Sequence, residues 1–151
     1  MASNAETALA IFEKRLGSEE GVGEWFTMDQ DRINLFADAT LDHQFIHVDP
    51  EKSAQLSPYT VTIAHGFLSS SFISTVIGTR LPGPGCVYVS QSLKFKAPVR
   101  PGDTVTARAT VTELDSARNR ATLRTTCTVG DTVVIDGEAV VLVPSQAQAA
   151  E

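Results

Sequence analysis

The 151-residue chain has the length of one ordinary domain, and its composition, 42% hydrophobic and 20% charged, is that of a folded globular protein. A net charge of −6 opposes non-specific binding to nucleic acid or to an anionic membrane surface. No apolar run has the length of a membrane span, and the first residues lack the features of a secretory leader. We therefore expect a soluble, cytoplasmic protein that binds neither nucleic acid nor membrane.

The N-terminal part of the chain predicts two helices separated by a glycine-rich connection and a short strand. Apolar residues recur at helical spacing over residues 5–16, and glycines then interrupt the pattern. Residues 24–28 predict a strand. A second helix is predicted over residues 30–40, with Thr27 or Asp29 as the capping residue.

The middle of the chain predicts an irregular segment followed by two helices. Residues 41–48 show no clear period. Asp49 and Pro50 form a typical helix start, and that helix ends near Leu56. A longer helix is predicted over residues 65–79, which are apolar and rich in small side chains. Because small side chains allow close approach, we expect strands to bury this helix on most sides.

Beyond residue 85 the apolar period changes from helical to two, which predicts strands. The predicted strands are residues 86–97, 103–114, 120–130 and 132–143. Consecutive strands after a buried helix indicate an α+β domain with an antiparallel sheet. The polar, alanine-rich residues 145–151 predict a disordered tail.

The two cysteines, Cys86 and Cys127, lie far apart in the chain and within apolar alternating runs. Neither has a histidine beside it in the sequence. We expect two packed, reduced thiols rather than a disulfide or a catalytic nucleophile.

All three histidines lie between residues 43 and 65, close to Asp42. Asp42 and His47 stand five residues apart in the irregular segment, where their side chains can turn toward one point. One of them can hold a water while the other moves a proton, and a histidine titrates near neutral pH. The alternative is structural: Asp42 caps a turn and His47 fills a polar niche. The pair alone does not decide between the two.

Gly66 opens the long predicted helix and leaves its first backbone N–H groups unshielded. The positive end of the helix dipole could polarise a carbonyl oxygen there and stabilise an enolate-like anion. Alternatively, Gly66 only permits close packing. For His65, just before it, we favour a structural role that caps the helix or orients its neighbours.

A metal site is not expected from these residues. His43 and His47 have the spacing of a helical ligand pair, but the segment lacks a helical period, and the chain contains no HExxH motif or cysteine pair. It also lacks a glycine-rich phosphate loop and a GxSxG nucleophile turn.

The chain resembles the MaoC-like (R)-specific enoyl-CoA hydratases over about residues 24–144. The likeness rests on FADATLDHQFIHVDP at residues 36–50 and IAHGFL at residues 63–68, and it continues through QSLKF at residues 91–95. The resemblance implies the hotdog fold, in which a curved antiparallel sheet wraps a long central helix. It also implies a homodimer or a dimer of dimers. Residues 1–23 are then an added helix and a glycine-rich connection.

The resemblance also implies roles for particular residues. Asp42 and His47 would be the catalytic dyad, and the Gly66 N–H would bind the thioester oxygen of an acyl-CoA substrate. Supporting polar residues would be Ser74, His65 and Gln44. No cofactor or metal is implied, because the thioester itself activates the alkene toward water. The product would be an (R)-3-hydroxyacyl-CoA.

Two departures and two rival functions belong beside this interpretation. Gln44-Phe45 stands where the family often has Asn-Pro, and the loop at residues 57–62 differs from the usual pattern. A thioesterase of the same fold usually carries a carboxylate on its central helix, but residues 66–79 contain none. A non-catalytic acyl-CoA-binding module would need no acid–base pair. Three cationic residues either approach the coenzyme phosphates or form a solvated strand face: Lys94, Lys96 and Arg100.

Overall fold

The computed structural model describes residues 21–143. The predicted helix at residues 5–16 and the predicted tail at residues 145–151 lie outside the described residues. Within them, every predicted helix and strand is present, with ends displaced by a few residues.

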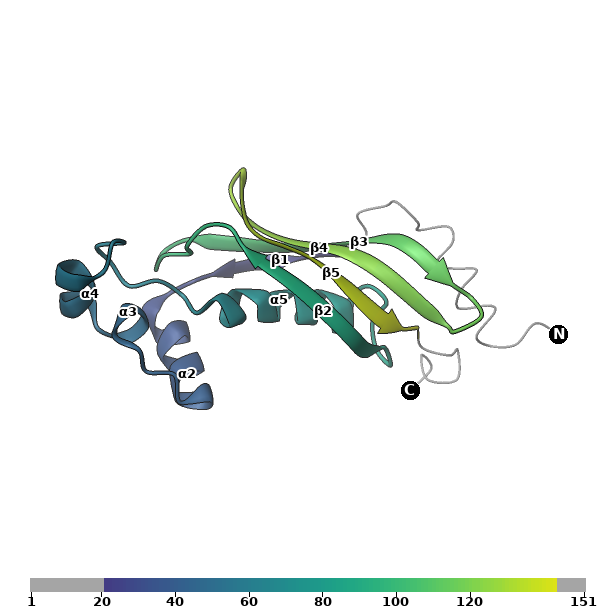
Figure 1. The fold of residues 1–151 in the computed structure, drawn as a ribbon, viewed down its shortest axis with the longest axis horizontal. Coiled ribbons are helices and arrows are strands. Elements are labelled where there is room, and N and C mark those ends of the chain that lie inside the picture. The colour runs from purple at the N-terminus through teal and green to yellow at the C-terminus, as the bar shows by residue number, and fades with distance from the viewer. Residues whose placement is uncertain (1–20, 144–151) are drawn as a thin grey trace.

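A curved five-stranded antiparallel sheet lies over one long helix, and three short helices gather at one end of the sheet (Figure 1). The strand order is β1-β3-β4-β5-β2. The strands are β1 (Gly21–Thr27), β2 (Val87–Phe95), β3 (Thr104–Asp115), β4 (Arg120–Val129) and β5 (Thr132–Leu142). The helices are α2 (Gln30–Thr40), α3 (Phe45–Val48), α4 (Pro50–Leu56) and α5 (Gly66–Thr79). This is the hotdog arrangement, so the predicted α+β fold is confirmed.

The core forms between α5 and the concave face of the sheet. Alternate residues of β3 point inward and are buried: Val105, Ala107, Ala109 and Val111. The residues of α5 that meet the sheet are Leu68, Phe72, Ile73, Val76 and Ile77. The prediction that α5 is buried on most sides is wrong for the described chain, because Ser71, Ser74 and Thr75 are exposed. The sheet covers α5 from one side only.

The short helices are held by side-chain caps and by one another. The Asp29 carboxylate accepts from the Arg32 N–H at 2.8 Å, and Asp49 accepts from the Lys52 N–H at 3.0 Å. Both predicted caps are therefore confirmed, with Asp29 rather than Thr27 starting α2. The segment predicted to be irregular contains the helical turn α3. Its Phe45 carbonyl accepts from the Asp49 N–H at 3.0 Å and from the Ser53 hydroxyl at 3.0 Å, so α4 stabilises a turn that has no apolar period of its own.

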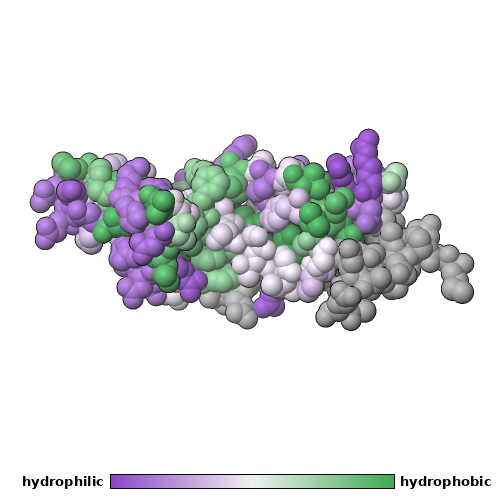
Figure 2. Space-filling view, turned by 90° about the horizontal axis from the view of Figure 1, so that it is seen from below, coloured by the Kyte–Doolittle hydropathy of each residue, from purple (hydrophilic) through white to green (hydrophobic). Residues whose placement is uncertain are grey.

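Strand β2 is an edge of the sheet, and much of its apolar surface is uncovered. Val87, Val89 and Phe95 are 55%, 43% and 52% exposed, although their alternation predicted one buried face. Figure 2 shows residues of hydrophobic and intermediate hydropathy along the middle of the molecule, while many hydrophilic residues lie at the end that carries α2, α3 and α4. The alternation therefore marks a surface that nothing within the described chain covers.

Both cysteines are free thiols, as predicted. Cys127 is fully buried in the core, and Cys86 is partly buried. Burial raises the pKa of Cys127 to about 12 and also raises the pKa of Cys86. Neither thiol is therefore a nucleophile near neutral pH. No helix within residues 21–143 is long and apolar enough to cross a membrane.

Replacing a core residue of α5 should lower the free energy of unfolding far more than replacing an exposed neighbour. Ile73 is 1% exposed, and Ile73→Ala should cost about 2–4 kcal/mol because it removes buried methyl groups and leaves a cavity. Ser74→Ala, at the next and exposed position, should cost less than about 0.5 kcal/mol. Urea denaturation at matched protein concentration measures both, and equal losses would contradict the described packing.

Candidate active site

His47 is held from both its ring and its backbone. Its Nδ1 lies 2.7 Å from the Ile63 carbonyl oxygen, and its own carbonyl accepts from the Gln30 amide at 2.7 Å. Because a carbonyl oxygen can only accept, Nδ1 must carry the hydrogen. In the neutral ring Nε2 is then the bare acceptor. His47 also lines a pocket, although its residue as a whole is only 8% exposed.

Burial lowers the pKa of His47, with a further lowering from the neighbouring His65 and an opposing effect from the hydrogen bond to Ile63. The ring is therefore neutral at pH 7. A neutral imidazole with a bare Nε2 can accept a proton from a bound water, so its state is that of a general base.

Asp42 lies beside His47 on the solvent side. The preceding Leu41 has φ 63°, which turns the chain sharply after α2, and the Asp42 side chain is 52% exposed. One Asp42 carboxylate oxygen and one ring nitrogen from each of His47 and His65 lie within 4.8 Å of one another. Two hydrogen bonds of about 2.8 Å that meet at a tetrahedral water span about 4.5 Å. The spacing therefore suits one water shared by Asp42 and His47.

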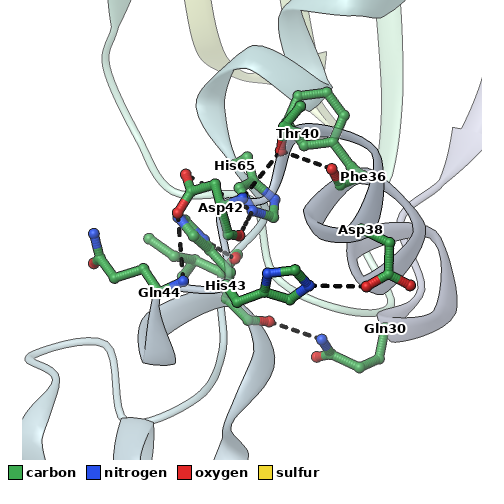
Figure 3. Close-up of polar contacts among 10 residues, drawn as sticks. Gln30, Phe36, Asp38, Thr40, Asp42, His43, Gln44 and His65 are labelled. Atoms are coloured by element: carbon green, nitrogen blue, oxygen red, sulfur yellow. Dashed lines mark hydrogen bonds and ion pairs between the residues drawn. The ribbon is translucent and has the colours of Figure 1, made fainter.

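Gln44 begins α3 and contacts Asp42 through its backbone, since its N–H donates to the Asp42 Oδ1 at 3.3 Å (Figure 3). Its side chain is exposed. The third histidine of the cluster, His43, turns away toward Asp38, and their side chains meet at 2.8 Å. That hydrogen bond raises the pKa of His43, whose side chain is 50% exposed.

His65 lies behind both members of the pair and is 4% exposed. Its ring stacks on the His47 ring with centroids 3.8 Å apart. The Phe36 ring is tilted against the His65 ring, with centroids 4.9 Å apart. Its Nε2 lies 3.0 Å from the Asp42 carbonyl oxygen and therefore donates to it. The expectation that His65 orients its neighbours agrees with these contacts.

Gly66 starts α5 at the wall of the same pocket. His65 provides no side-chain cap, and within the described residues the N–H groups of Gly66 and Phe67 make no hydrogen bond. A Cβ on Gly66 would come within 2.6 Å of the Phe95 ring, so only glycine admits that ring here. Gly66 therefore permits the close packing considered from the sequence, and it stands at the positive end of a 14-residue helix; its role toward a carbonyl oxygen stays a prediction.

The pocket has a volume of about 340 Å³ and mostly apolar walls. Its lining residues are His47, Tyr59, Ile63, Ala64, Gly66, Phe67, Ser69, Phe95, Lys96, Ala97, Pro98, Val99 and Ile135. Asp42 and His65 are not part of the lining; Asp42 stands outside it beside His47. Such a cavity, apolar with a few convergent polar groups, suits a small-molecule ligand with an apolar portion.

Several other expected positions also lie outside the pocket lining within the described chain. Ser74 is exposed on α5 and lies about 12 Å along the helix from its first residue. Its supporting role stays a prediction. Of the three cationic residues considered, Lys96 lines the pocket, whereas Lys94 and Arg100 do not.

Sequence reasoning missed three residues of the site. The Gln30 amide donates to the His47 carbonyl, and its Oε1 accepts from the Thr62 hydroxyl at 2.6 Å, so Gln30 ties α2 to the loop before α5. Ser69 lines the pocket, and its buried hydroxyl has no hydrogen-bond partner within the described residues. No local pattern marks these residues, because their partners come from distant segments.

The geometry is poorly suited to a metal ion, although Asp42, His47 and His65 lie close together. The two rings are stacked with centroids 3.8 Å apart and an interplanar angle of 26°, so their in-plane lone pairs lie in nearly parallel planes. In addition, carbonyl oxygens already occupy one nitrogen of each ring. Zinc requires ligands that converge tetrahedrally, which this stack does not provide.

The sequence profile of the MaoC like domain matches residues 12–134 of the chain. The chain belongs to the MaoC-like family. An (R)-specific enoyl-CoA hydratase of Rhodospirillum rubrum is 56% identical over 120 residues, which cover 80% of this MaoC-like chain and 83% of the relative. A 3-hydroxybutyryl-CoA dehydratase of Methylorubrum extorquens is 46% identical over 139 residues, which cover 92% of this chain and 80% of the relative.

Solved structures with the same fold include two R-hydratases. The unliganded enzyme of Pseudomonas aeruginosa superposes with a TM-score of 0.80 at 32% identity, over 87% of this MaoC-like chain and 83% of that one. The (R)-hydratase of A. caviae superposes with a TM-score of 0.77 at 37% identity, over 82% and 96% of the two chains.

The pKa values of His43 and His47 should lie on opposite sides of the ordinary histidine value. We expect the pKa of His43 above its ordinary value of 6.5 and that of His47 below it, because an aspartate pairs with the first and burial desolvates the second. Since folding disfavours the protonated His47, its contribution to stability is complete above about pH 6.5 and is lost as the pH falls toward the lower native pKa.

Nitrogen-15 NMR of histidine-labelled protein measures these titrations and the tautomers together. His47 should show a protonated Nδ1 and His65 a protonated Nε2. A protonated Nε2 in neutral His47 would contradict its assignment as a base.

Proposed function

We propose that this MaoC-like protein catalyses the (R)-specific, reversible hydration of trans-2-enoyl-CoA to (R)-3-hydroxyacyl-CoA. One observation carries the proposal. Neutral His47, whose Nε2 is bare, presents a ring nitrogen within 4.8 Å of an Asp42 carboxylate oxygen, beside a helix N-terminus whose first amides make no hydrogen bond within the described residues. The named activities of the relatives support it.

In the proposed complex the thioester oxygen accepts from the Gly66 N–H. The helix dipole then draws electron density onto that oxygen, which makes the β-carbon electrophilic. Negative charge that develops on the oxygen as water adds meets a preorganised donor. The pocket walls exclude bulk water, which strengthens this interaction.

The proton steps follow from the tautomer of His47. A water held by Asp42 and His47 transfers one proton to His47 Nε2 while its oxygen forms the bond to the β-carbon. The alkene electrons move to the α-carbon and the thioester oxygen, and a proton returned from the dyad completes the α C–H bond. One water is consumed, and nothing is oxidised or reduced, so the reaction needs neither a cofactor nor a metal.

The pocket favours hydration over thioester hydrolysis. Among the described residues no Asp or Glu lines the pocket, and α5 carries none. A thioesterase would need a carboxylate or another nucleophile near the thioester carbon. We also propose a cytoplasmic location, which an acyl-CoA substrate supports.

We further propose that two copies pair through β2. This strand is an edge of the sheet, so the outward backbone groups lack a partner strand within the described chain. Exposed apolar side chains accompany them, namely Val87, Tyr88, Val89 and Phe95. Antiparallel pairing of β2 with its copy would continue the sheet across both protomers and place the partner near the pocket, because Phe95 also lines it.

Asp42→Ala and His47→Ala should each lower turnover of crotonyl-CoA by about a hundredfold or more, the usual weight of acid–base catalysis. His43→Ala should stay within about threefold of the parent, because that exposed ring turns away from Asp42 and His47 toward Asp38. Loss of enoyl absorbance measures hydration, and a thiol reagent measures free coenzyme A. Near-normal hydration by either dyad variant, or release of coenzyme A by the parent, would contradict the proposal.

The proposed dimer predicts a mass near twice 16.2 kDa in light scattering. Val89→Asp should shift the protein toward the monomer, because a buried, unpaired charge at the paired edge is costly. Val133→Asp, at an exposed position on β5, should leave the mass unchanged. A monomeric parent would exclude the dimer.

A further inference from the structure

His65 makes contacts that no step of the proposed reaction uses. It is 4% exposed, carries no capping hydrogen bond from its side chain to α5, and stays outside the pocket lining. Its ring nevertheless touches Asp42 and His47. A buried imidazole in such a place costs desolvation and side-chain entropy, so its contacts call for a physical explanation.

The contact with Asp42 is the one that anchors the exposed aspartate to the rest of the fold. Other hydrogen bonds of Asp42 in the described chain are local: its N–H donates to the Thr40 hydroxyl at 3.4 Å, and its Oδ1 accepts from the Gln44 N–H at 3.3 Å. His65 Nε2–H donates to the Asp42 carbonyl at 3.0 Å across 23 residues of sequence. The same nitrogen lies 4.0 Å from Asp42 Oδ2 (Figure 3).

The contact with His47 fixes the plane of the second ring. The centroids are 3.8 Å apart, and the two rings enclose 26°. Rotation of the His47 ring would break both the stacking contact with His65 and the hydrogen bond to the Ile63 carbonyl. Since Ile63 lies two residues before His65, one short segment supports both restraints on His47.

One atom of His65 is left without a partner. Its Nδ1 is buried and has no hydrogen bond within the described residues. A purely structural position would gain from a residue that leaves no polar atom unsatisfied, because each such atom costs about 1–3 kcal/mol. An imidazole combines a flat face that stacks on His47 with an N–H that reaches the Asp42 carbonyl oxygen.

We propose that His65 is a positioning residue, which holds the Asp42 carboxylate and the His47 imidazole in reactive alignment mainly through its hydrogen bond to Asp42, with the stacked ring as the weaker restraint. It does not line the pocket, so it would act through Asp42 and His47. A displacement of about 1 Å at a reacting group can cost about a hundredfold in rate, so a residue that fixes two such groups affects kcat strongly. This inference rests on the proposed hydratase activity.

Two substitutions separate the hydrogen bond from the stack. His65→Phe keeps a flat ring against His47 and Phe36 but removes the donor to Asp42. His65→Gln loses the ring but places an amide N–H close to the position of Nε2. We expect kcat for crotonyl-CoA to fall about tenfold to a hundredfold in His65→Phe with KM changed less than about threefold, and His65→Gln to recover most of the loss.

The matched controls are His43→Phe and His43→Gln. They change an exposed histidine next to Asp42 and should leave kcat within about twofold of the parent. Thermal unfolding shows whether each variant is folded. If His65→Phe does not fold, His65→Asn replaces it, because its shorter amide cannot reach the Asp42 carbonyl.

A second readout does not need turnover. Amide hydrogen exchange of the peptide that covers residues 41–47 should be about tenfold faster in His65→Phe than in the parent and near the parent rate in His65→Gln. If the parent protein does not hydrate enoyl-CoA, the proposed function is wrong, but hydrogen exchange still tests whether His65 anchors residues 41–47. If the parent is active, the role of His65 is contradicted by a His65→Phe variant that keeps its kcat. It is also contradicted if the Phe and Gln variants lose kcat equally.

Discussion

The hydrogen bond from His47 Nδ1 to the Ile63 carbonyl, 2.7 Å long, decides the chemistry available at this site. It uses one ring nitrogen for structure and so leaves Nε2 as the acceptor. Burial then keeps the ring neutral by lowering its pKa. It also ties α3 to the segment that leads into α5, so the base and the helix N-terminus are fixed by the same few residues.

The hotdog fold supplies the other half of the site by leaving one end of α5 uncovered. The sheet curves over the body of the helix, while α2, α3 and α4 gather at its amino end (Figure 1). The Ala64 N–H donates to the Val99 carbonyl at 2.8 Å, which attaches this end to the sheet side. Gly66 then lets Phe95 close the pocket wall without covering the amides.

The site contains unsatisfied polar atoms that a core designed only for stability would avoid. His65 Nδ1 and the Ser69 hydroxyl are both buried without hydrogen bonds within the described residues. Native proteins rarely leave such groups unpaired, and the exceptions call for an explanation. Here both atoms lie within one turn of Gly66, where the fold gives up stability to keep donors and rings aligned around a ligand cavity.

The sequence by itself determined what depends on neighbouring residues. Helical and alternating periods predicted the elements, Asp29 and Asp49 predicted their helix starts, and the spacing of Asp42 and His47 predicted that they could share a water. The orientation of His65 toward residues 18 and 23 positions away, the support from Gln30 and the open face of β2 were decided by the tertiary structure alone. Periodicity reports which face of an element is apolar, but only the folded chain determines which distant groups meet that face and which face stays uncovered.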